Sequence, residues 1–389
     1  MEKKILFVEI CDYHSVPVGG YLSFAKQMIS AFGSQLYLVG SSIEEGDPIG
    51  EWFKKEINGI EFNYFSIKKT STNKKTFLPQ RFINFILIKF YKKKILSCGL
   101  KNVFVQTPET LLALNLKNSY NLCVRVPGLR NPLSISRYKY AKYLENLFDN
   151  LTSKAYHRSN IVLATGDKKE IIEFKKRSNY DFDKKLIQFP SRINTKVFKI
   201  EDKQNIRSRL GLDPECVYVV VSGRLSGLKG WRLILDSFNI FKQRIGNSKL
   251  LFIGDGEDYD LIKNHISENL LDNDVELLGR KSHKELALYL NSSNIYVSGS
   301  FVEGWSTSLM EAISCGLPAV VTNFSSAKEL IRNGYNGYVL ENRDCLEFAS
   351  LMEKALYIEQ KNLINYSNEM NKYCTSKLKL DILNIWKLK

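Results

Sequence analysis

The sequence of 389 residues has few of the features that mark a specialised class of protein. No apolar run reaches the 18 or so residues that a membrane-spanning helix needs, and the apolar stretch near the start is too short for a secretory signal. Glycine (23) and proline (9) are too sparse for a fibrous or low-complexity chain. With 44% hydrophobic and 25% charged residues, we expect a globular protein of two domains.

Metal ligands are also scarce. The seven cysteines are scattered, no two of them form a Cys-x-x-Cys pair, and only four histidines are present. This composition excludes a zinc cluster and a disulfide framework. We therefore expect a reduced, cytoplasmic protein with free thiols and no bound metal.

Acidic residues are absent from residues 66–102, which hold ten Lys or Arg. This stretch carries much of the net charge of +15, so the expected partner is anionic: a nucleic acid, a phosphate-bearing small molecule or a membrane surface. The sequence contains no known nucleic-acid-binding motif, and the aromatic residues of the stretch occur at the density of a buried core. We therefore expect no nucleic-acid partner.

The basic stretch predicts a charged loop at 67–75 and a helix at 78–96 that is apolar over most of its surface and basic at its ends. Two interpretations stay open: a helix that lies on an anionic bilayer, and a buried helix with a fringe of solvated lysines. The first is slightly favoured. It predicts that residues 67–96 contact the anionic inner leaflet of a membrane.

The first half of the chain predicts the start of a parallel sheet. An apolar strand at 4–10 is followed by a loop with Gly19 and Gly20, a helix at 21–32 and a strand at 35–39. This order is typical of a βαβ unit. Further along, one long helix is predicted at 136–154, and a polar stretch predicts a domain boundary near residue 190.

The second half alternates regularly between strands and helices, from a strand at 217–222 to a helix at 345–358. Such alternation predicts a doubly wound α/β domain, which binds its ligands at the carboxyl ends of the strands. Two glycine-containing motifs occupy such positions.

The first motif, at residues 222–230, directly follows a strand and precedes a helix. Gly223 lets the backbone approach an oxygen-rich ligand, and Arg224 and Lys229 supply positive charge. The glycine spacing fits neither the dinucleotide fingerprint nor the P-loop. An ordinary strand–helix turn with solvated basic residues is an equally good interpretation of this motif alone.

The second motif, at residues 300–311, also joins a strand to a helix. Glu303 lies in its glycine loop, and Ser306 is expected to cap the helix, so that the amides of Thr307 and its neighbour can bind an anion. Glu311 follows inside the helix. The alternative interpretation gives Glu303 a favourable place near a helix N-terminus and Glu311 a solvent-exposed one.

Together these motifs resemble the donor domain of the retaining family 4 glycosyltransferases with the GT-B fold. The resemblance covers residues 221–340, and the order and spacing of its motifs make it specific. The motifs are Gly223-Arg224-Leu225 with Lys229-Gly230, Ile253-Gly254-Asp255-Gly256, Leu278-Gly279, Glu303-Gly304-Trp305 with Glu311-Ala312, Cys315-Gly316-Leu317-Pro318-Ala319-Val320 and Asn336-Gly337. The first half matches more loosely, through Gly19-Gly20 and residues 190–198.

The resemblance implies a role for each matched residue. Arg224 and Lys229 would neutralise the donor diphosphate, Glu303 would face the donor sugar and Glu311 would bind the ribose hydroxyls. Catalysis would thus depend on Glu303, Arg224 and Lys229. The further donor-binding residues would be Gly19, Gly20, Gly223, Arg280, Gly304, Trp305, Ser306 and Thr307, with Arg280 beside the base. The implied chemistry needs no metal, cofactor or covalent nucleophile, and the expected donors are UDP- or GDP-sugars.

The first domain departs from the family pattern. Many members carry a His-Gly pair after a central strand, where this sequence has Pro127-Gly128. Arg125 or Arg130 is expected to hold the donor sugar instead.

Two other positions bear on the substrates. Trp305-Ser306 replaces the family's Phe-Gly pair and is expected to reshape the sugar pocket. His14 lies in the loop before Gly19. It is a candidate acceptor contact or proton carrier, unless it is a loop residue without a role.

The implied architecture is α/β: two Rossmann-like, doubly wound domains that face an interdomain cleft. An acceptor-binding domain would span 1–190, a donor-binding domain 191–364, and a C-terminal helix at 365–389 would return to the first. The implied reaction moves a sugar from a nucleotide-diphosphate donor to a glycan hydroxyl with retention of configuration.

The expected setting is bacterial surface polysaccharide synthesis (O-antigen, capsule or exopolysaccharide) on a lipid carrier. The protein would then be peripheral at the inner face of the cytoplasmic membrane. A soluble or protein acceptor, and a catalytically silent relative that binds nucleotides or glycans, stay open as alternatives.

Overall fold

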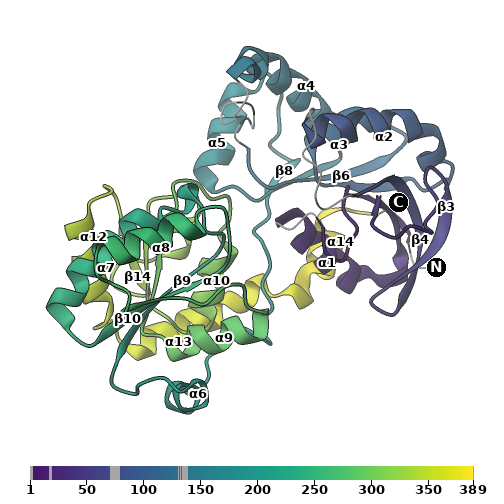
Figure 1. The fold of residues 1–389 in the computed structure, drawn as a ribbon. Coiled ribbons are helices and arrows are strands. Elements are labelled where there is room, and N and C mark those ends of the chain that lie inside the picture. Colours follow the sequence, from purple (N-terminus) through teal and green to yellow (C-terminus); the bar gives the residue numbers. More distant parts are fainter. Residues whose placement is uncertain are drawn as a thin grey trace. The chain divides into compact units, whose positions relative to one another are not determined.

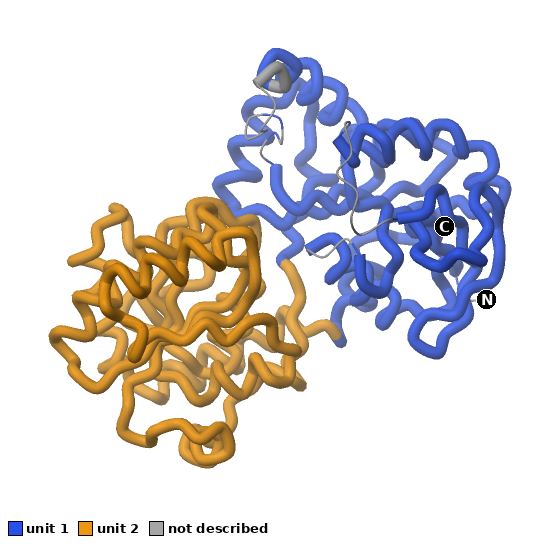
Figure 2. Tube along the Cα trace, in the orientation of Figure 1, with its two compact units in different colours: residues 1–190, 376–389 blue, residues 191–375 orange. Residues whose placement is uncertain are grey.

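The computed structural model describes residues 3–16, 20–70, 79–129, 131, 133 and 139–388. The chain forms two compact units, which Figure 2 shows in different colours. Unit 1 comprises residues 1–190 and 376–389, and unit 2 comprises residues 191–375. Each unit has a sheet of its own with helices around it (Figure 1).

The described part of unit 1 contains one sheet of eight strands in the order β3-β4-β2-β1-β5-β6-β7-β8. All neighbours pair in parallel except β3 and β4. The strands are β1 (Ile5–Val8), β2 (Leu36–Ser42), β3 (Trp52–Ile57), β4 (Ile60–Lys69), β5 (Asn102–Val105), β6 (Asn121–Val126), β7 (Ile161–Ala164) and β8 (Leu186–Gln188).

Helices cover both faces of this sheet and bury one apolar core on each. On one face lie α2 (Gln80–Leu96), α3 (Pro108–Leu114), α4 (Glu145–Arg158) and α5 (Lys168–Arg177), which bury residues such as Ile88, Leu111, Tyr156 and Phe174. On the other lie α1 (Gly20–Phe32) and α14 (Leu378–Ile385), which bury Met28 and Ile382. Because side chains alternate along a strand, each strand contributes to both cores.

The antiparallel pair β3 and β4 is a hairpin that was not predicted from the sequence. Its turn residues Asn58 and Gly59 have φ of 54° and 76°, the left-handed geometry of a two-residue hairpin turn. The predicted charged loop at 67–75 begins within β4, because Ile67 is buried in the core. Residues 71–78 lie outside the described residues.

The predicted helix at 136–154 differs from the observed one. The structure has a 3-10 helix at Lys139–Leu144 followed by α4, while residues 134–138 lie outside the described residues. A tighter 3-10 turn at the start of an α-helix is common. The helix continues to Arg158 because Tyr156 is anchored in the core.

Unit 2 has one sheet of six parallel strands in the order β11-β10-β9-β12-β13-β14. The strands are β9 (Val217–Ser222), β10 (Ser248–Ile253), β11 (Val275–Leu277), β12 (Ile295–Ser298), β13 (Ala319–Thr322) and β14 (Gly337–Leu340). All six were predicted from the sequence. The doubly wound α/β architecture is therefore confirmed for this unit.

Helices also cover both faces of the second sheet. One core includes residues of α7 (Trp231–Ile245), α8 (Tyr259–Glu268) and α12 (Cys345–Ala355). The other includes residues of α9 (His283–Ser292), α10 (Thr307–Ser314), α11 (Ala327–Leu330) and α13 (Gln360–Glu369). Helix α6 (Lys203–Leu210) lies beside α9.

The C-terminal part of the chain contributes side chains to the cores of both units. Tyr366 and Met370 are buried in a core of unit 2, whereas Leu378, Ile382 and Trp386 are buried in a core of unit 1. The sequence-based division ends the second domain at residue 364, but the structure keeps residues up to 375 in unit 2 because these side chains fill its core.

In the part of the chain that the structure describes, no helix combines the length and the apolar composition needed to span a bilayer.

Candidate functional site

The glycine motifs of unit 2 lie together at the carboxyl edge of its sheet. The loops after β9 and β10 are joined by hydrogen bonds from Gly223 N to Ile253 O (3.0 Å) and from Leu225 N to Asp255 O (3.0 Å). β9 lies between β10 and β12, so the loop after β12 starts next to them. Ligands of doubly wound sheets bind at such a point, where the strand order reverses.

Gly254 allows the two loops to approach closely. Its φ is +152°, and a Cβ at this position would lie 1.8 Å from the carbonyl oxygen of Gly223. No L side chain fits without displacing the loop that carries Arg224. The motif therefore needs glycine here for steric reasons.

Replacing Gly254 by alanine is expected to lower the free energy of unfolding by roughly 3 kcal/mol, because the clash is with backbone rather than with a flexible side chain. Thermal unfolding measures the effect. Gly246→Ala is the matched control, since Gly246 also has positive φ (+79°), but a Cβ added there would have no atom within 4 Å. Equal losses in both variants would show that backbone strain, not the close approach, makes Gly254 necessary.

A pocket opens at this edge, and four of the predicted residues line it: Gly223, Arg224, Lys229 and Glu303. Five hydroxyl side chains also line it: Ser222, Ser226, Ser298, Ser300 and Ser308. The sequence analysis missed these serines as side-chain contacts. For Ser222, Ser298 and Ser300 the position at or just after the ends of β9 and β12 was the available signal, whereas Ser308 lies at the start of α10.

Lys229 and Glu303 form an ion pair between the Nζ of Lys229 and the Oε1 of Glu303. The Oγ of Ser300 donates a second hydrogen bond to the same Oε1, at 2.8 Å. The side chains of Lys229 and Glu303 are 33% and 15% exposed, so the pair is partly shielded from water. In this pocket each charge has the other as its partner.

Arg224 is the more exposed cation of the pocket. Its Nε lies 2.8 Å from Glu257, and both side chains are largely exposed. An exposed ion pair of this kind contributes little to stability, so Arg224 can leave Glu257 for an anionic ligand.

Glu311 lies in α10, three residues after Ser308. No described residue donates a hydrogen bond to its carboxyl group, and burial raises the pKa of Glu311 to about 8. The Tyr296 hydroxyl donates to Ser308 Oγ at 3.0 Å, which ties this ring to a residue that lines the pocket. Burial, opposed by the bond to Ser308, raises the pKa of Tyr296, and both Glu303 and Glu311 add to that rise. Glu311 is thus close to the pocket without lining it.

The N-terminus of α10 has the predicted cap. Ser306 Oγ accepts a hydrogen bond from Leu309 N at 3.4 Å, and Ser306 N donates to Ser326 Oγ at 3.1 Å. The amide of Thr307 begins the helix beside Gly304 and the pocket-lining Ser308. This geometry directs the positive end of the helix dipole to the edge of the pocket.

Trp305 and Arg280 do not line this pocket. Trp305 is buried in the core of unit 2, with its ring edge-on to Tyr373 at 5.9 Å. Arg280 follows Gly279 after β11 and is exposed.

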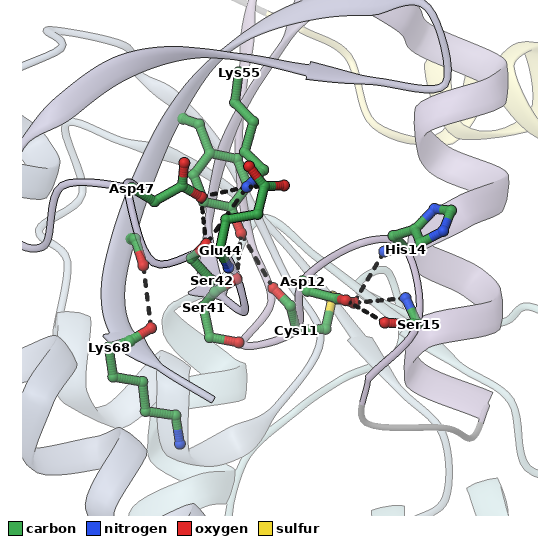
Figure 3. A network of polar contacts seen from close by, with 12 residues as sticks. Cys11, Asp12, His14, Ser15, Ser41, Ser42, Glu44, Asp47, Lys55 and Lys68 are labelled. Atoms are coloured by element: carbon green, nitrogen blue, oxygen red, sulfur yellow. Dashed lines mark hydrogen bonds and ion pairs between the residues drawn. The ribbon is translucent and has the colours of Figure 1, made fainter. Parts of the chain in front are cut away.

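Of the predicted residues of unit 1 that the structure describes, His14 and Gly20 follow β1 at the carboxyl edge of that unit's sheet, and Arg125 is near the end of β6. Gly20 begins α1, whereas Gly19 and Arg130 lie outside the described residues. His14 is exposed, and its backbone N donates to Asp12 Oδ1 at 2.9 Å. Figure 3 shows its imidazole pointing away from that carboxylate.

Asp12 organises the loop that carries His14. Besides His14 N, the Oδ1 of Asp12 accepts from the backbone N of Ser15, and Oδ2 accepts from Ser15 Oγ at 2.6 Å (Figure 3). The same Oδ1 also accepts from the backbone N of Val16 at 2.8 Å. Burial would raise the pKa of Asp12, but these hydrogen bonds outweigh it and hold the pKa below its usual value. The loop is therefore fixed by an ionised carboxylate.

Arg125 is buried within unit 1 rather than exposed to a ligand. Its guanidinium lies 4.1 Å from the ring centre of Phe24 and donates to Gln106 Oε1 at 3.2 Å. Burial lowers the pKa of Arg125 to about 10 and raises that of the neighbouring Glu9 to about 8. In the described structure Arg125 belongs to a buried polar cluster behind the carboxyl edge.

Among the described residues, no group of three or more His, Cys, Asp or Glu is placed to hold a metal ion. A reaction without a metal stays a prediction.

Comparison with known proteins supports a relationship for unit 2. Residues 202–374 match the family "Glycosyl transferases group 1". The poly(glycerol-phosphate) alpha-glucosyltransferase of Bacillus subtilis is 32% identical over 133 residues, which are 34% of this chain and 20% of that protein. The amylovoran biosynthesis glycosyltransferase AmsK of Erwinia amylovora is 29% identical over 169 residues, 39% of this chain and 41% of that protein.

One relative aligns over more of the chain. The alpha-monoglucosyldiacylglycerol synthase of Acholeplasma laidlawii is 21% identical over 290 residues, which are 71% of this chain and 70% of that protein. The two relatives named before it are matched over less than half of their own length.

Solved structures extend the likeness to both units. The sucrose-phosphate synthase of Thermosynechococcus elongatus superposes with a TM-score of 0.76 at 14% identity, over 99% of this chain and 98% of its own. The HepE protein of Anabaena in complex with UDP gives 0.75 at 15% identity, over 98% of both chains. At these identities the likeness concerns the fold, and the predicted GT-B fold of two Rossmann-like sheets is confirmed. The match to the family "Glycosyl transferases group 1" thus concerns unit 2, and the likeness in fold to solved GT-B structures concerns the whole chain.

Proposed function

We propose that the protein transfers a sugar from a nucleotide-diphosphate donor to a glycan hydroxyl with retention of the anomeric configuration. The observation that carries the proposal is the placement of Arg224, Lys229 and Glu303 around one pocket at the carboxyl edge of the unit 2 sheet. Two cations and one carboxylate within one small pocket suit a ligand that combines a diphosphate with sugar hydroxyls.

In this proposal each chemical group of the nucleotide-sugar donor has a partner on the protein. Lys229 and Arg224 neutralise the diphosphate, and the amide of Thr307 adds the positive end of α10. Glu303 accepts hydrogen bonds from the sugar. Glu311, which is desolvated and has no described donor, hydrogen-bonds the ribose hydroxyls.

The proposed mechanism uses charges of the protein in place of a divalent ion. As the bond between sugar and phosphate breaks, negative charge develops on the leaving diphosphate, where Lys229 and Arg224 stabilise it. The leaving phosphate oxygen accepts the proton of the acceptor hydroxyl on the same face of the sugar, so configuration is retained without a covalent nucleophile.

The base is proposed to be uracil or guanine, beside Arg280. Arg280 follows Gly279, whose carbonyl oxygen accepts from Gly254 N at 3.0 Å, so the strand end that carries Arg280 is tied to the pocket loops. Structures of HepE with the same fold hold UDP, which supports a uridine nucleotide.

The acceptor is proposed to be a lipid-linked glycan of surface polysaccharide synthesis. A relative named for amylovoran biosynthesis and one named for a glucosyldiacylglycerol support a polysaccharide or lipid acceptor. A soluble or protein acceptor is the alternative. A catalytically silent nucleotide- or glycan-binding protein is a further one, against which the complete set of Arg224, Lys229, Glu303 and Glu311 speaks.

Association with an anionic membrane is proposed for residues 67–96, which places the protein at the inner face of the cytoplasmic membrane. Helix α2 packs on the sheet through Ile88 and Ile95, while Phe82, Ile86 and Phe90 on its other side are 50%, 47% and 76% exposed. Exposed apolar side chains with lysines between them suit the interface of an anionic bilayer.

A donor screen tests the proposed reaction. UDP- or GDP-sugars are expected to raise the unfolding temperature of the full chain, since a ligand that binds only the folded state stabilises it. Slow release of free sugar from the same donor is expected without any added metal and in the presence of a chelator. The proposal would be overturned in favour of the silent alternative if UDP-, GDP- and ADP-sugars all failed to stabilise the chain and none of them was hydrolysed.

A further inference from the structure

Helix α4 and the 3-10 turn before it carry an apolar stripe that the described part of unit 1 leaves uncovered. Tyr143, Leu147 and Leu151 are 90%, 56% and 46% exposed. Leu147 and Leu151 are four residues apart, so they lie on one side of α4, and Tyr143 precedes them in the 3-10 turn. Tyr156 and Thr152, on the opposite side, are buried. The stripe thus faces outward from unit 1.

The charges of α4 are sorted by side as well. The two acids, Glu145 and Asp149, lie two and six positions after Tyr143, which places them away from the stripe at about 3.6 residues per turn. Lys154, eleven positions after Tyr143, lies in line with the stripe and is exposed. The outward side of α4 is therefore apolar and basic.

Helix α2 carries a second stripe of exposed apolar and basic side chains. Phe82 and Ile86 share their side of the helix with Lys89 and Lys93, all four exposed, and Phe90 lies beside them with 76% of its surface exposed. Residues 66–102, which include α2, contain no acid. A surface of exposed apolar side chains and lysines fits an anionic bilayer, in which the apolar region lies beneath negatively charged headgroups.

The two stripes belong to one layer. Residues of α2, α3 and α4 are buried in the same core, and α3 packs against both of the others (Figure 1). Five of the seven residues of α3 are buried, so it lies deeper than its neighbours. Both outward stripes therefore flank a recessed helix on the same side of the sheet.

We infer that the stripes of α2 and α4 form one docking surface for an anionic lipid bilayer, in which α4 is a second contact in addition to α2. The inference rests on the membrane association proposed above and extends it to Tyr143, Leu147 and Leu151. Apolar side chains enter the interface, and the lysines of both helices contact lipid phosphates. A second copy of the chain is a poor occupant, because Lys89, Lys93 and Lys154 would meet the same charges on the copy.

Vesicle flotation with the full chain tests this. One variant changes the α4 stripe (Tyr143→Ser, Leu147→Ser, Leu151→Ser) and one changes α2 (Phe82→Ser, Ile86→Ser, Phe90→Ser). The matched control changes three exposed apolar residues of unit 2 (Leu261→Ser, Leu270→Ser, Tyr357→Ser), which are 51%, 87% and 82% exposed. Thermal unfolding and the donor-induced shift verify that each variant is folded.

We expect wild type and control to float equally with vesicles that contain phosphatidylglycerol and neither to float with phosphatidylcholine alone. Each stripe variant is expected to bind the anionic vesicles roughly tenfold more weakly. An α4 variant that floats like wild type would overturn the inference while leaving the role of α2 intact. Wild type that does not float would overturn both membrane proposals, and the donor screen would still decide the transferase function separately. A dimeric wild type that the α4 substitutions convert to a monomer would assign the stripe to a second copy instead.

Discussion

Lys229→Ala is expected to lower the rate of sugar transfer by about 10²–10³-fold, the usual effect of removing one group that stabilises developing charge. Lys229 is one of two cations that line the pocket among the described residues, and the other, Arg224, is tied to Glu257 on an exposed surface. Without Lys229 the pocket loses one of the two cations that the proposed mechanism places on the leaving diphosphate. The value of kcat/KM for the best donor, measured by release of the nucleoside diphosphate, gives the effect.

Lys249→Ala is the matched control for this substitution. Lys249 is also a lysine of unit 2 paired with a glutamate, Glu276 at 3.2 Å, but it lies in β10 and does not line the pocket. Lys249→Ala is expected to keep kcat/KM within about twofold of the wild-type value, since an ion pair on the surface contributes little. A Lys229→Ala protein with normal turnover would show that the diphosphate is neutralised elsewhere and would contradict the proposed site.

Glu303→Gln is expected to separate binding from transfer. In the ligand-free pocket Glu303 holds Lys229, so a diphosphate must compete with a carboxylate for the same ammonium group. Glutamine retains the shape and a hydrogen bond to Ser300 but not the charge. Binding of UDP or GDP without a sugar is therefore expected to become roughly tenfold tighter. The rate of sugar transfer is expected to fall, because the sugar hydroxyls lose the charged carboxylate that accepts their hydrogen bonds.

Calorimetric titration with the nucleoside diphosphate and with the nucleotide sugar measures both parts of this prediction. Ser300→Ala serves as a comparison, because it removes the 2.8 Å hydrogen bond to Glu303 and leaves the ion pair in place. Unchanged or weaker binding of the nucleoside diphosphate by Glu303→Gln would mean that the pair does not compete with phosphate. The transfer assay would then decide whether Glu303 acts on the sugar alone.

The sheet of unit 2 was predictable because of its burial. Strands of a parallel sheet covered by helices on both faces appear as continuous apolar runs, such as residues 217–221. Loops with glycine follow β9, β10 and β12, so the position of the pocket at the carboxyl edge also followed from the sequence.

The hairpin of unit 1 was not predictable by the same signal. β3 is the edge strand of its sheet, and its sequence contains Lys54, Lys55 and Glu56 in a row. The sequence of such an edge strand contains no continuous apolar run, because half of the strand's surface is exposed to water. Its Asn58-Gly59 turn was the remaining clue.

Within the site, the charged residues were easier to predict than the neutral ones. Arg224, Lys229 and Glu303 stand out because they are charged residues in glycine-containing loops that follow strands. Serines such as Ser298 and Ser308 are common everywhere in a sequence, and only the folded chain brings them to one pocket. Trp305 belongs to the same motif, yet its ring turns into the core toward Tyr373, a residue 68 positions further along the chain.

By itself the sequence determined the alternation of strands and helices, the two glycine motifs of unit 2 and the basic stretch at 66–102. These features are local: each depends on neighbours within a few residues, through backbone geometry and apolar periodicity. The tertiary structure alone decided that Lys229 meets Glu303, that Arg125 is buried, and that α2 and α4 expose their apolar sides in one layer. Those outcomes depend on contacts between residues far apart in the chain, which strand order and core packing determine.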